Sequence, residues 1–147
     1  TPKQRNLVQI SWKDGRTPII CATVAFGMGV DNAHVRFVIH QTMPKSVEGY
    51  YQESGRAGRD GQPAEAVLLF HQRDVGRVKR LIYMAKGKKK SKEIKVKLME
   101  QMQEYCVDAR ECRRKLILAY FGETFCAERC AGTCDNCAAR NKRRPRK

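Results

Sequence analysis

The sequence lacks several patterns that would define its class at once. It contains no GxxxxGK[ST] phosphate loop and no DExH-type magnesium-binding segment, which excludes a self-contained P-loop nucleoside triphosphatase. No apolar run approaches the roughly 20 residues that cross a bilayer, and no signal-peptide pattern opens the chain. We therefore expect no membrane partner. The chain starts at Thr1 without Met, so we expect it to be part of a longer protein.

Acidic residues are scarce. The 147 residues include 30 Lys and Arg but only 15 Asp and Glu, which gives a formal net charge of +15. Such an excess favours a polyanionic partner and opposes self-association. We expect that partner to be nucleic acid rather than an anionic membrane surface.

The seven cysteines are an odd number, whereas a secreted disulfide framework normally uses an even one. Closely spaced cysteines without a signal peptide indicate a metal in a reducing compartment. Cys134 and Cys137 form a CxxC pair, which needs two more thiolates for a tetrahedral zinc site. Cys112 can fold back across a turn to join them. The remaining ligand is expected from the loop before the CxxC pair, where Cys130 is favoured and Cys126 is the alternative.

Hydrophobic patterning predicts an α/β chain with short strands of a parallel sheet, because β-branched runs alternate with amphipathic segments. The strands are expected at residues 18–24, 35–40 and 65–71. The helices are expected at residues 45–54, 72–84, 94–106 and 112–121, after a first helix that starts at Thr1 and buries Leu7, Val8, Ile10 and Trp12. Cys106 is expected to pack on the apolar face of its helix.

A lysine-rich run at residues 86–92 contains no apolar side chain, and we interpret it as a solvated linker. We therefore divide the chain into an α/β part at residues 1–85 and a cysteine-containing helical subdomain at residues 86–137. The basic segment at residues 138–147 is expected to be a disordered tail.

Residues 52–61 read QESGRAGRDG and hold two arginines, Arg56 and Arg59, among three glycines. The arginine fork matches phosphate oxygens, and glycine lets a ligand approach the backbone closely. Such arginines can stabilise the terminal phosphoryl group of a triphosphate as it leaves. The alternative is a polar turn whose arginines pair with surface carboxylates, but the complete string is more specific than that.

Residues 22–31 read ATVAFGMGVD and follow the first expected strand. Ligands bind at the carboxyl ends of parallel strands, so this segment belongs on the functional edge of the sheet. The amides around Gly27 and Gly29 can bind a phosphate, and Asp31 can accept from a ribose hydroxyl. A structural turn is the alternative.

The strings at residues 22–31 and 52–61 together resemble the last two conserved helicase motifs of the RecQ family of DNA helicases. The segment from ECRR at residues 111–114 to CDNC at residues 134–137 resembles that family's zinc-binding subdomain, and residues 112–123 look most similar to its Bloom-type branch. The resemblance implies that residues 1–85 are the later part of a second RecA-like domain and that residues 86–137 are the zinc-binding subdomain.

By this resemblance, Arg59 is the finger that reaches the γ-phosphate, Arg56 supports it, and Gln52 couples the nucleotide to the DNA site. Gly29 would face the nucleotide together with the two arginines, and Asp31 would either face the nucleotide or link to Arg56. Thr23 would face DNA phosphates. Arg113 and Arg114 would either stabilise the thiolates or contact DNA.

The family plan selects Cys112, Cys130, Cys134 and Cys137 as ligands of a structural Zn²⁺. ATP and Mg²⁺ would bind at a site shared with a first RecA-like domain, so we expect this chain alone to be inactive. The parent would unwind DNA with 3′–5′ polarity, act on single-stranded, forked or junction DNA in replication, recombination and repair, and reside in the nucleus. Topoisomerase and recombination-protein partners are also implied.

Two other functions fit part of the pattern. A zinc-stabilised DNA-binding module without a nucleotide role would explain the charge and the cysteines, but not the arginine string. A DEAD-box-like RNA helicase would explain the arginines, but not the cysteines.

Overall fold

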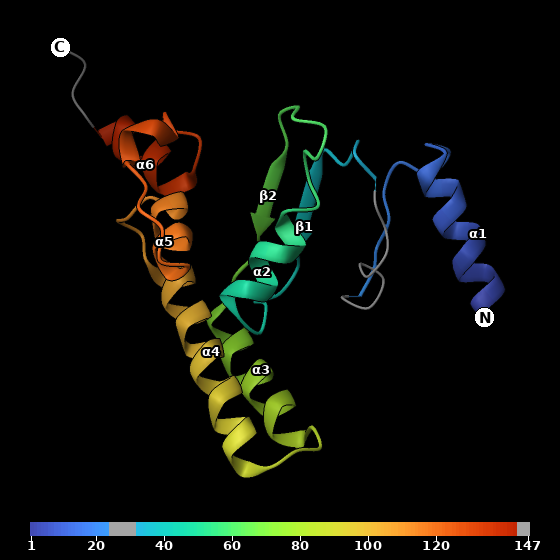
Figure 1. Cartoon of the computed structure of the whole chain (residues 1–147), viewed down its shortest axis with the longest axis horizontal. Helices are drawn as coiled ribbons and strands as arrows, with labels where there is room; N and C mark the ends of the chain where they lie inside the picture. The colour runs from blue at the N-terminus through green and yellow to red at the C-terminus, as the bar shows by residue number, and fades with distance from the viewer. Residues whose placement is uncertain (24–31, 144–147) are drawn as a thin grey trace. The chain divides into compact units, whose positions relative to one another are not determined.

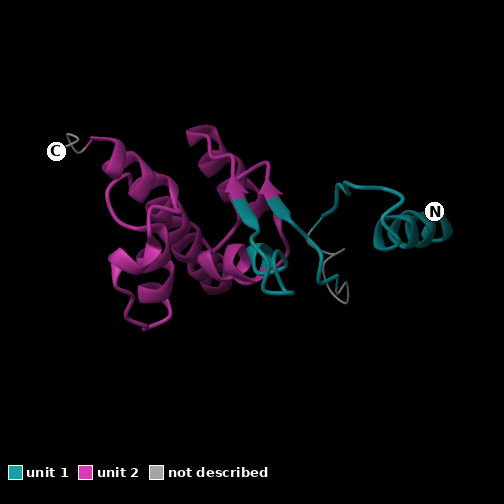
Figure 2. Cartoon of the chain, turned by 90° about the horizontal axis from the view of Figure 1, so that it is seen from above, with its two compact units in different colours: residues 1–38, 53–66 teal, residues 39–52, 67–147 magenta. Residues whose placement is uncertain are grey.

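A computed structural model describes residues 1–23 and 32–143 (Figure 1). Its elements, in order, are α1 (Pro2–Lys13), β1 (Phe37–His40), α2 (Val47–Ser54), β2 (Glu65–Leu68), α3 (Gln72–Met84), α4 (Lys89–Val107), α5 (Arg113–Tyr120), the 3-10 helix η2 (Ala127–Cys130) and α6 (Asp135–Arg143). The chain divides into two compact units, residues 1–38 with 53–66 and residues 39–52 with 67–147 (Figure 2).

The predicted α/β class is confirmed. β1 and β2 form a two-stranded parallel sheet at two of the three expected places. The backbone N–H of Glu65 donates to the carbonyl of Arg36, and that of Leu69 donates to the carbonyl of His40, both at 2.9 Å. In both bonds the donor lies 29 residues after the acceptor, and this constant difference shows that the two strands run parallel.

The strand expected at residues 18–24 is not found in its described part, residues 18–23. Residue 24 lies outside the described residues. A β-branched run becomes a strand only when a neighbouring strand satisfies its backbone groups. Among the described residues the sheet contains β1 and β2 alone, so this run has no strand beside it.

Helix α1 forms where it was expected because Thr1 and Gln4 make a reciprocal capping box and Pro2 occupies the first turn. Its predicted buried face is wrong, however. Leu7, Val8 and Ile10 are 59%, 51% and 49% exposed, and the helix buries no residue. The apolar positions were correctly spaced for a helix, but the described chain brings nothing over them.

The second unit is built on the antiparallel α3–α4 hairpin, whose helices lie side by side in Figure 1. Its core is a single buried cluster contributed by α2, α3, α4 and the loop before α2: Met43, Val47, Tyr50, Val78, Ile82, Val96, Met99, Met102 and Tyr105. Asp74 is buried in the first turn of α3 and accepts from the N–H groups of His71 and Met43. It therefore fastens the loop before α2 to the start of α3.

The lysine-rich run is not simply a linker. α4 begins at Lys89, five residues before the expected start, so the connection from α3 is only residues 85–88. Lysine is a good helix former, and a solvated lysine can still occupy a helical turn. Because α3 and α4 pack against each other within one unit, the structure does not separate the chain at residue 86.

The segment expected to be a disordered tail is also helical in part. α6 continues to Arg143, beyond the expected limit of the subdomain at residue 137. Its first turn is anchored by buried Asn136 and Cys137, and basic residues lie in its last turn. That placement complements the negative end of the helix dipole.

Within residues 1–23 and 32–143, we find no helix that combines the length and the apolar character needed to cross a bilayer.

Candidate functional sites: an arginine loop and a four-cysteine cluster

The arginine string leaves the end of α2 as a sequence of tight turns. Gln52 lies exposed in the last turn of the helix. The N–H of Arg56 then donates to the carbonyl of Glu53 at 3.3 Å. The N–H of Gly58 crosses to the carbonyl of Val35 at 3.0 Å, just before β1. The loop is thus hydrogen-bonded to the segment that enters the sheet, with Arg56 half-buried and Arg59 exposed on either side of the anchor.

Gly58 is required for two separate reasons. Its φ is +70°, in the left-handed region that L side chains rarely adopt. A Cβ added there would also lie 3.0 Å from Ala64 Cβ and 3.0 Å from the carbonyl oxygen of Gln62. Gly61 has a similar φ of +76°, but a Cβ there would meet nothing within 4 Å. Gly61 therefore requires glycine only for its backbone conformation, whereas Gly58 requires it for both its conformation and its close packing.

The carboxylate of the string is held by an arginine outside it. Arg36 Nη2 lies 2.6 Å from Asp60 Oδ1 and 2.7 Å from Oδ2, and the N–H of Gln62 donates to Oδ1 at 3.1 Å. The hydrogen bond from Arg36 is the main reason that the pKa of Asp60 lies below its usual value. Arg36 also donates to the carbonyl of Pro63. The contacts of Arg36 thus hold the loop at its far end.

Of the upstream motif at residues 22–31, the structure describes residues 22 and 23. Gly29 and Asp31 lie outside the described residues. Thr23 is exposed at the end of a described segment without regular structure. Their roles therefore stay predictions.

Four cysteines from three elements converge in the second unit. Cys112 precedes α5, Cys130 ends η2, and Cys134 and Cys137 flank the start of α6. Their sulfurs all lie within 4.8 Å of one another, and the Cys112 and Cys134 sulfurs are 4.0 Å apart. A tetrahedral zinc with bonds of about 2.3 Å spaces its sulfurs by about 3.8 Å. The cluster therefore fits a zinc ion after small adjustments.

The structure separates the rival third cysteines. Cys130 is fully buried in the cluster. Cys126 is exposed, and its thiol donates to Glu128 Oε2 at 2.5 Å instead. Cys106 packs against the apolar core as predicted, and burial raises the pKa of its thiol to about 11.

The electrostatics of the cluster also fit a cation. Burial opposes ionisation of Cys130, but hydrogen bonds from Thr133, the Cys134 backbone and the Cys134 and Cys112 thiols lower its pKa to about 6. Burial, followed by the interaction with Cys134, raises the pKa of Cys137 to about 12. The raised pKa of Cys137 opposes formation of its thiolate, and a bound dication would favour that thiolate.

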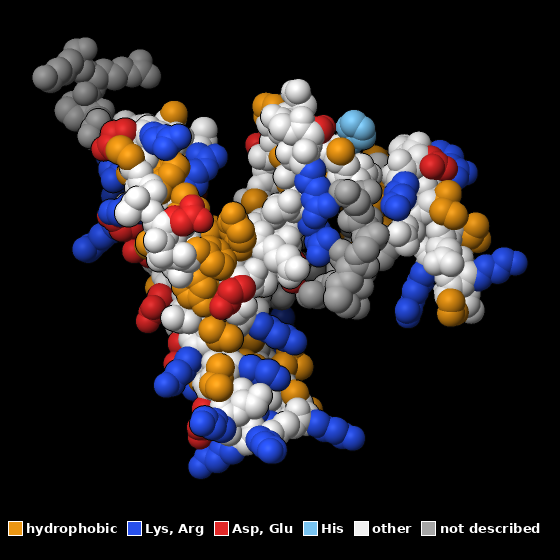
Figure 3. All heavy atoms as spheres, in the orientation of Figure 1, with side chains coloured by type: hydrophobic (Ala, Val, Ile, Leu, Met, Phe, Trp, Pro, Cys, Tyr) orange, Lys and Arg blue, Asp and Glu red, His pale blue; other side chains and the backbone are white. Residues whose placement is uncertain are grey.

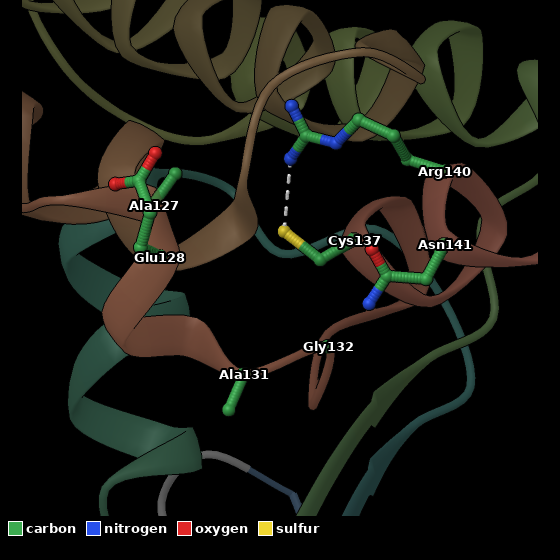
Figure 4. A pocket seen from close by; sticks show the side chains of 7 residues that line it. All are labelled: Ala127, Glu128, Ala131, Gly132, Cys137, Arg140 and Asn141. Carbon is green, nitrogen blue, oxygen red and sulfur yellow. Dashed lines mark hydrogen bonds between the residues drawn. The ribbon is translucent and has the colours of Figure 1, made fainter. Parts of the chain in front are cut away.

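Two arginines donate to sulfurs of the cluster. Arg114 Nη1 lies 3.4 Å from Cys130 Sγ and also donates to the Thr133 hydroxyl. Arg140 Nη2 lies 3.1 Å from Cys137 Sγ, over a pocket between η2 and α6 (Figure 4). For Arg114, the contacts match the thiolate-stabilising alternative. Arg140 was missed because its role depends on how α6 turns back over the cluster.

Arg113 has a different task from its neighbour. Its Nε and Nη2 donate to the two carboxylate oxygens of Asp135, both at 2.9 Å, and its Nη1 donates to the carbonyl of Tyr105 at 2.5 Å. The guanidinium also lies over the Tyr105 ring, 5.3 Å from its centroid. With its side chain only 19% exposed, Arg113 links the end of α4 to the cysteine loop. A DNA contact by Arg113 stays a prediction.

The two residues between Cys134 and Cys137 bind the segment that joins α4 to the first residue of α5. Asp135 binds Arg113, and the Asn136 amide donates to the carbonyls of Asp108 and Glu111 at 2.9 and 2.7 Å. Asp135 and Asn136, the polar residues inside the CxxC motif, were the sequence signal that could have predicted these contacts. The cysteine spacing alone did not predict them.

Comparisons with known proteins agree with this arrangement. The family model "Helicase conserved C-terminal domain" matches residues 1–61, and "RecQ zinc-binding" matches residues 72–138. The chain is 46% identical over 134 residues to the ATP-dependent DNA helicase hus2/rqh1 of Schizosaccharomyces pombe, covering 91% of the chain and 10% of that protein. It is 46% identical over 149 residues to the RecQ-like DNA helicase BLM of Xenopus laevis, covering 97% and 11%. It is 44% identical over 137 residues to the ATP-dependent helicase SGS1 of Saccharomyces cerevisiae, covering 92% and 10%.

These matches define a C-terminal helicase region joined to a zinc-binding region. The chain belongs to the RecQ family of DNA helicases. It spans about a tenth of the length of these relatives.

The two glycines of the arginine loop give a matched test of its packing. Gly61→Ala should cost about 1 kcal/mol, because a left-handed φ penalises an L side chain. Gly58→Ala should cost about 2–3 kcal/mol, because steric overlap with Gln62 and Ala64 is added to the same penalty. Urea unfolding of both variants would measure the difference. Equal costs would mean that the close approach at Gly58 is unimportant.

The Arg113 junction gives a second test. Arg113→Lys keeps the charge but loses the fork that spans Asp135 and Tyr105. We expect a loss of about 2 kcal/mol in the free energy of unfolding, the range for hydrogen bonds to charged groups. Thermal unfolding followed by circular dichroism would measure it, with Arg110→Lys on the same connection as the control. A variant as stable as this control would show that the junction contributes little.

Proposed function

We propose that this chain supplies one wall of the ATP site, and part of the DNA-binding surface, of an ATP-dependent 3′–5′ DNA helicase of RecQ type. The observation that carries the proposal is the arginine loop, which is hydrogen-bonded to the segment before β1 and precedes a four-cysteine cluster in the same chain. A DNA-binding module without a nucleotide role would need the cluster and the charge, but not two arginines around a constrained glycine.

In this proposal Arg59 contacts the γ-phosphate and stabilises the charge that develops during its transfer. Arg56 supports it from its half-buried position, and Gln52 couples the loop to the DNA site. A loop fixed by backbone hydrogen bonds suits this role, because donors placed in advance need no reorganisation during the reaction. Gly29 and Asp31 would lie on the nucleotide side, and Thr23 on the DNA side.

The other wall must come from a domain with a phosphate loop, since the present sequence contains none. That domain would hold most of the ATP and the Mg²⁺, and the chain by itself would not hydrolyse ATP. For the complete protein we propose unwinding of forked or junction DNA in replication, recombination and repair, in the nucleus, with topoisomerase and recombination proteins as partners.

We further propose that Cys112, Cys130, Cys134 and Cys137 hold a structural Zn²⁺. Four thiolates leave no open coordination position, which is typical of a structural rather than a catalytic site. When bound, the ion would supply charge neutralisation and a cross-link among the segment before α5, η2 and α6. Arg114 and Arg140 would offset the remaining negative charge of the thiolates through the contacts described above.

The nucleotide role is tested by ATP turnover after the chain is joined to the phosphate-loop domain of a RecQ relative. Arg59→Ala should lower the DNA-stimulated turnover number by roughly 10³-fold or more, as loss of an arginine finger does. Arg16→Ala is the control, because Arg16 is an exposed arginine paired with Asp14. Turnover that survives Arg59→Ala would favour the binding-module alternative, as would turnover that never exceeds that of the added domain alone.

The metal assignment is tested by zinc content and chelation of the reduced chain. Wild type and Cys126→Ser should each retain about one zinc, and helicity should fall on chelation because metal binding supplies folding free energy. Cys130→Ser should lose most of its zinc. The reverse order of the two serine variants would make Cys126 the third ligand.

A further inference from the structure

The end of the α3–α4 hairpin carries a concentration of positive charge that the proposed ATP and zinc sites do not use. From residue 75 to residue 92 the sequence contains no acidic residue. It contains eight basic ones: Arg77, Lys79, Arg80, Lys86, Lys88, Lys89, Lys90 and Lys92. All are exposed except Lys92, which is half-buried. Figure 3 shows Lys and Arg side chains gathered over this end of the hairpin, at the bottom of the view.

This charge is carried on an ordered scaffold. Val78 and Ile82 of α3 and Val96 of α4 are buried in one cluster directly behind it. The Lys92 ammonium donates to the carbonyl of Tyr83 at 2.7 Å, which joins the first turn of α4 to the last turn of α3. The basic side chains therefore project from two packed helices and the four-residue connection between them.

The arrangement on α3 is a row. Arg73, Arg77 and Arg80 are spaced by four and three residues, so they lie on one face of the helix, away from the buried positions. The row is about 10 Å long at 1.5 Å per residue, and over such a length duplex DNA presents about six backbone charges. Arg77 also has a 3.8 Å contact with Asp74, which leaves its exposed guanidinium accessible to a second anion.

The lysines of α4 are unfavourable for the fold itself. Lys88, Lys89, Lys90 and Lys92 lie in or just before the first turn, where the helix has no side-chain N-cap and no acidic residue. A positive charge at a helix N-terminus is destabilising, because it repels the positive end of the helix dipole. Apart from Lys92, whose ammonium bonds to the Tyr83 carbonyl, the helix dipole does not favour these lysines, whereas binding of a polyanion to the basic surface would.

We propose that this basic hairpin end, residues 77–92 with Arg73, is a second DNA-binding surface that holds the backbone phosphates of duplex DNA. The inference rests on the DNA partner of the proposed function and assigns that partner a place on the chain. Recognition is by charge, without base contacts, so it is independent of sequence and sensitive to salt.

The test compares two sets of three substitutions with equal charge loss. One variant carries Lys88→Gln, Lys89→Gln and Lys90→Gln, and the other carries Lys3→Gln, Arg5→Gln and Lys13→Gln on exposed positions of α1. Binding of each to a fluorescent 20-base-pair duplex is measured by anisotropy over a range of salt concentrations. The hairpin variant should bind at least tenfold more weakly at about 100 mM salt and lose about 2.7 from the log–log salt slope. The α1 variant should change affinity less than threefold. Equal losses would overturn the proposal, because net charge alone would then explain binding.

Two further measurements keep the result interpretable. Thermal unfolding should show the hairpin variant to be at least as stable as wild type, because charges that oppose the helix dipole have been removed. Vesicles rich in phosphatidylserine should compete weakly with the duplex. Preferred binding to those vesicles would assign the surface to a membrane, and an equal loss on a single-stranded 20-mer would assign it to unpaired DNA; either result overturns the duplex assignment. If duplex binding is unchanged while Arg59→Ala still abolishes ATP turnover, the hairpin proposal fails and the helicase assignment stands.

Discussion

The second unit depends on the contacts of one guanidinium group. Its apolar cluster lies between α2, α3 and α4, and its cysteine cluster lies between the start of α5, η2 and α6; these are separate groups of buried residues. Arg113 joins them, because its donors reach the Tyr105 carbonyl at the end of α4 and the Asp135 carboxylate inside the CxxC motif. Tyr105 in turn packs against Tyr50 of α2, with ring centroids 5.5 Å apart. Metal binding at the cysteines would therefore stabilise more than the cysteine loop, since the same junction contacts the helix that leads to the arginine string.

In the first unit, the arginine loop is likewise held by a small number of contacts. The N–H of Gly58 ties the loop to Val35, and Arg36, the next residue, grips Asp60 at the far end. Two adjacent residues before β1 thus hold two points of the loop. At Gly58 the loop also packs closely against residues 62–64, because a Cβ added there would lie 3.0 Å from atoms of Gln62 and Ala64. Arg56 and Arg59 therefore project from a backbone constrained on both sides of them. Such a constraint is what electrostatic stabilisation of a transferring phosphoryl group requires.

Sequence patterns predicted the bounds of the helices better than they predicted which surfaces those helices and strands pack against. α2, α3 and α5 were expected within two residues of their observed bounds, because amphipathic spacing determines them and, in α3, a capping box also marks the start. The run at residues 18–24 and the apolar face of α1 failed for one physical reason: each needs a partner surface, and periodicity does not say whether one is present. The spacing from Cys112 favoured Cys130 over Cys126, and the structure places Cys130 in the cluster. The tasks of Arg113 and Arg140 were not predictable in this way, because they depend on how α6 packs against α4 and α5.

The basic residues differ in what they contribute to the structure, and the difference follows from their chemistry. Arg36, Arg113 and Arg114 each place a planar guanidinium between fixed acceptors, a task that suits a rigid fork of donors, and Arg140 donates to the Cys137 sulfur. Lysines at the hairpin end carry compact, hydrated charges on flexible stems, and the first turn of α4 is an unfavourable place for them. Both kinds of residue contribute to the formal charge of +15. The paired arginines have acceptors within the fold, whereas the excess charge at the hairpin end is the part that we propose to bind an external polyanion.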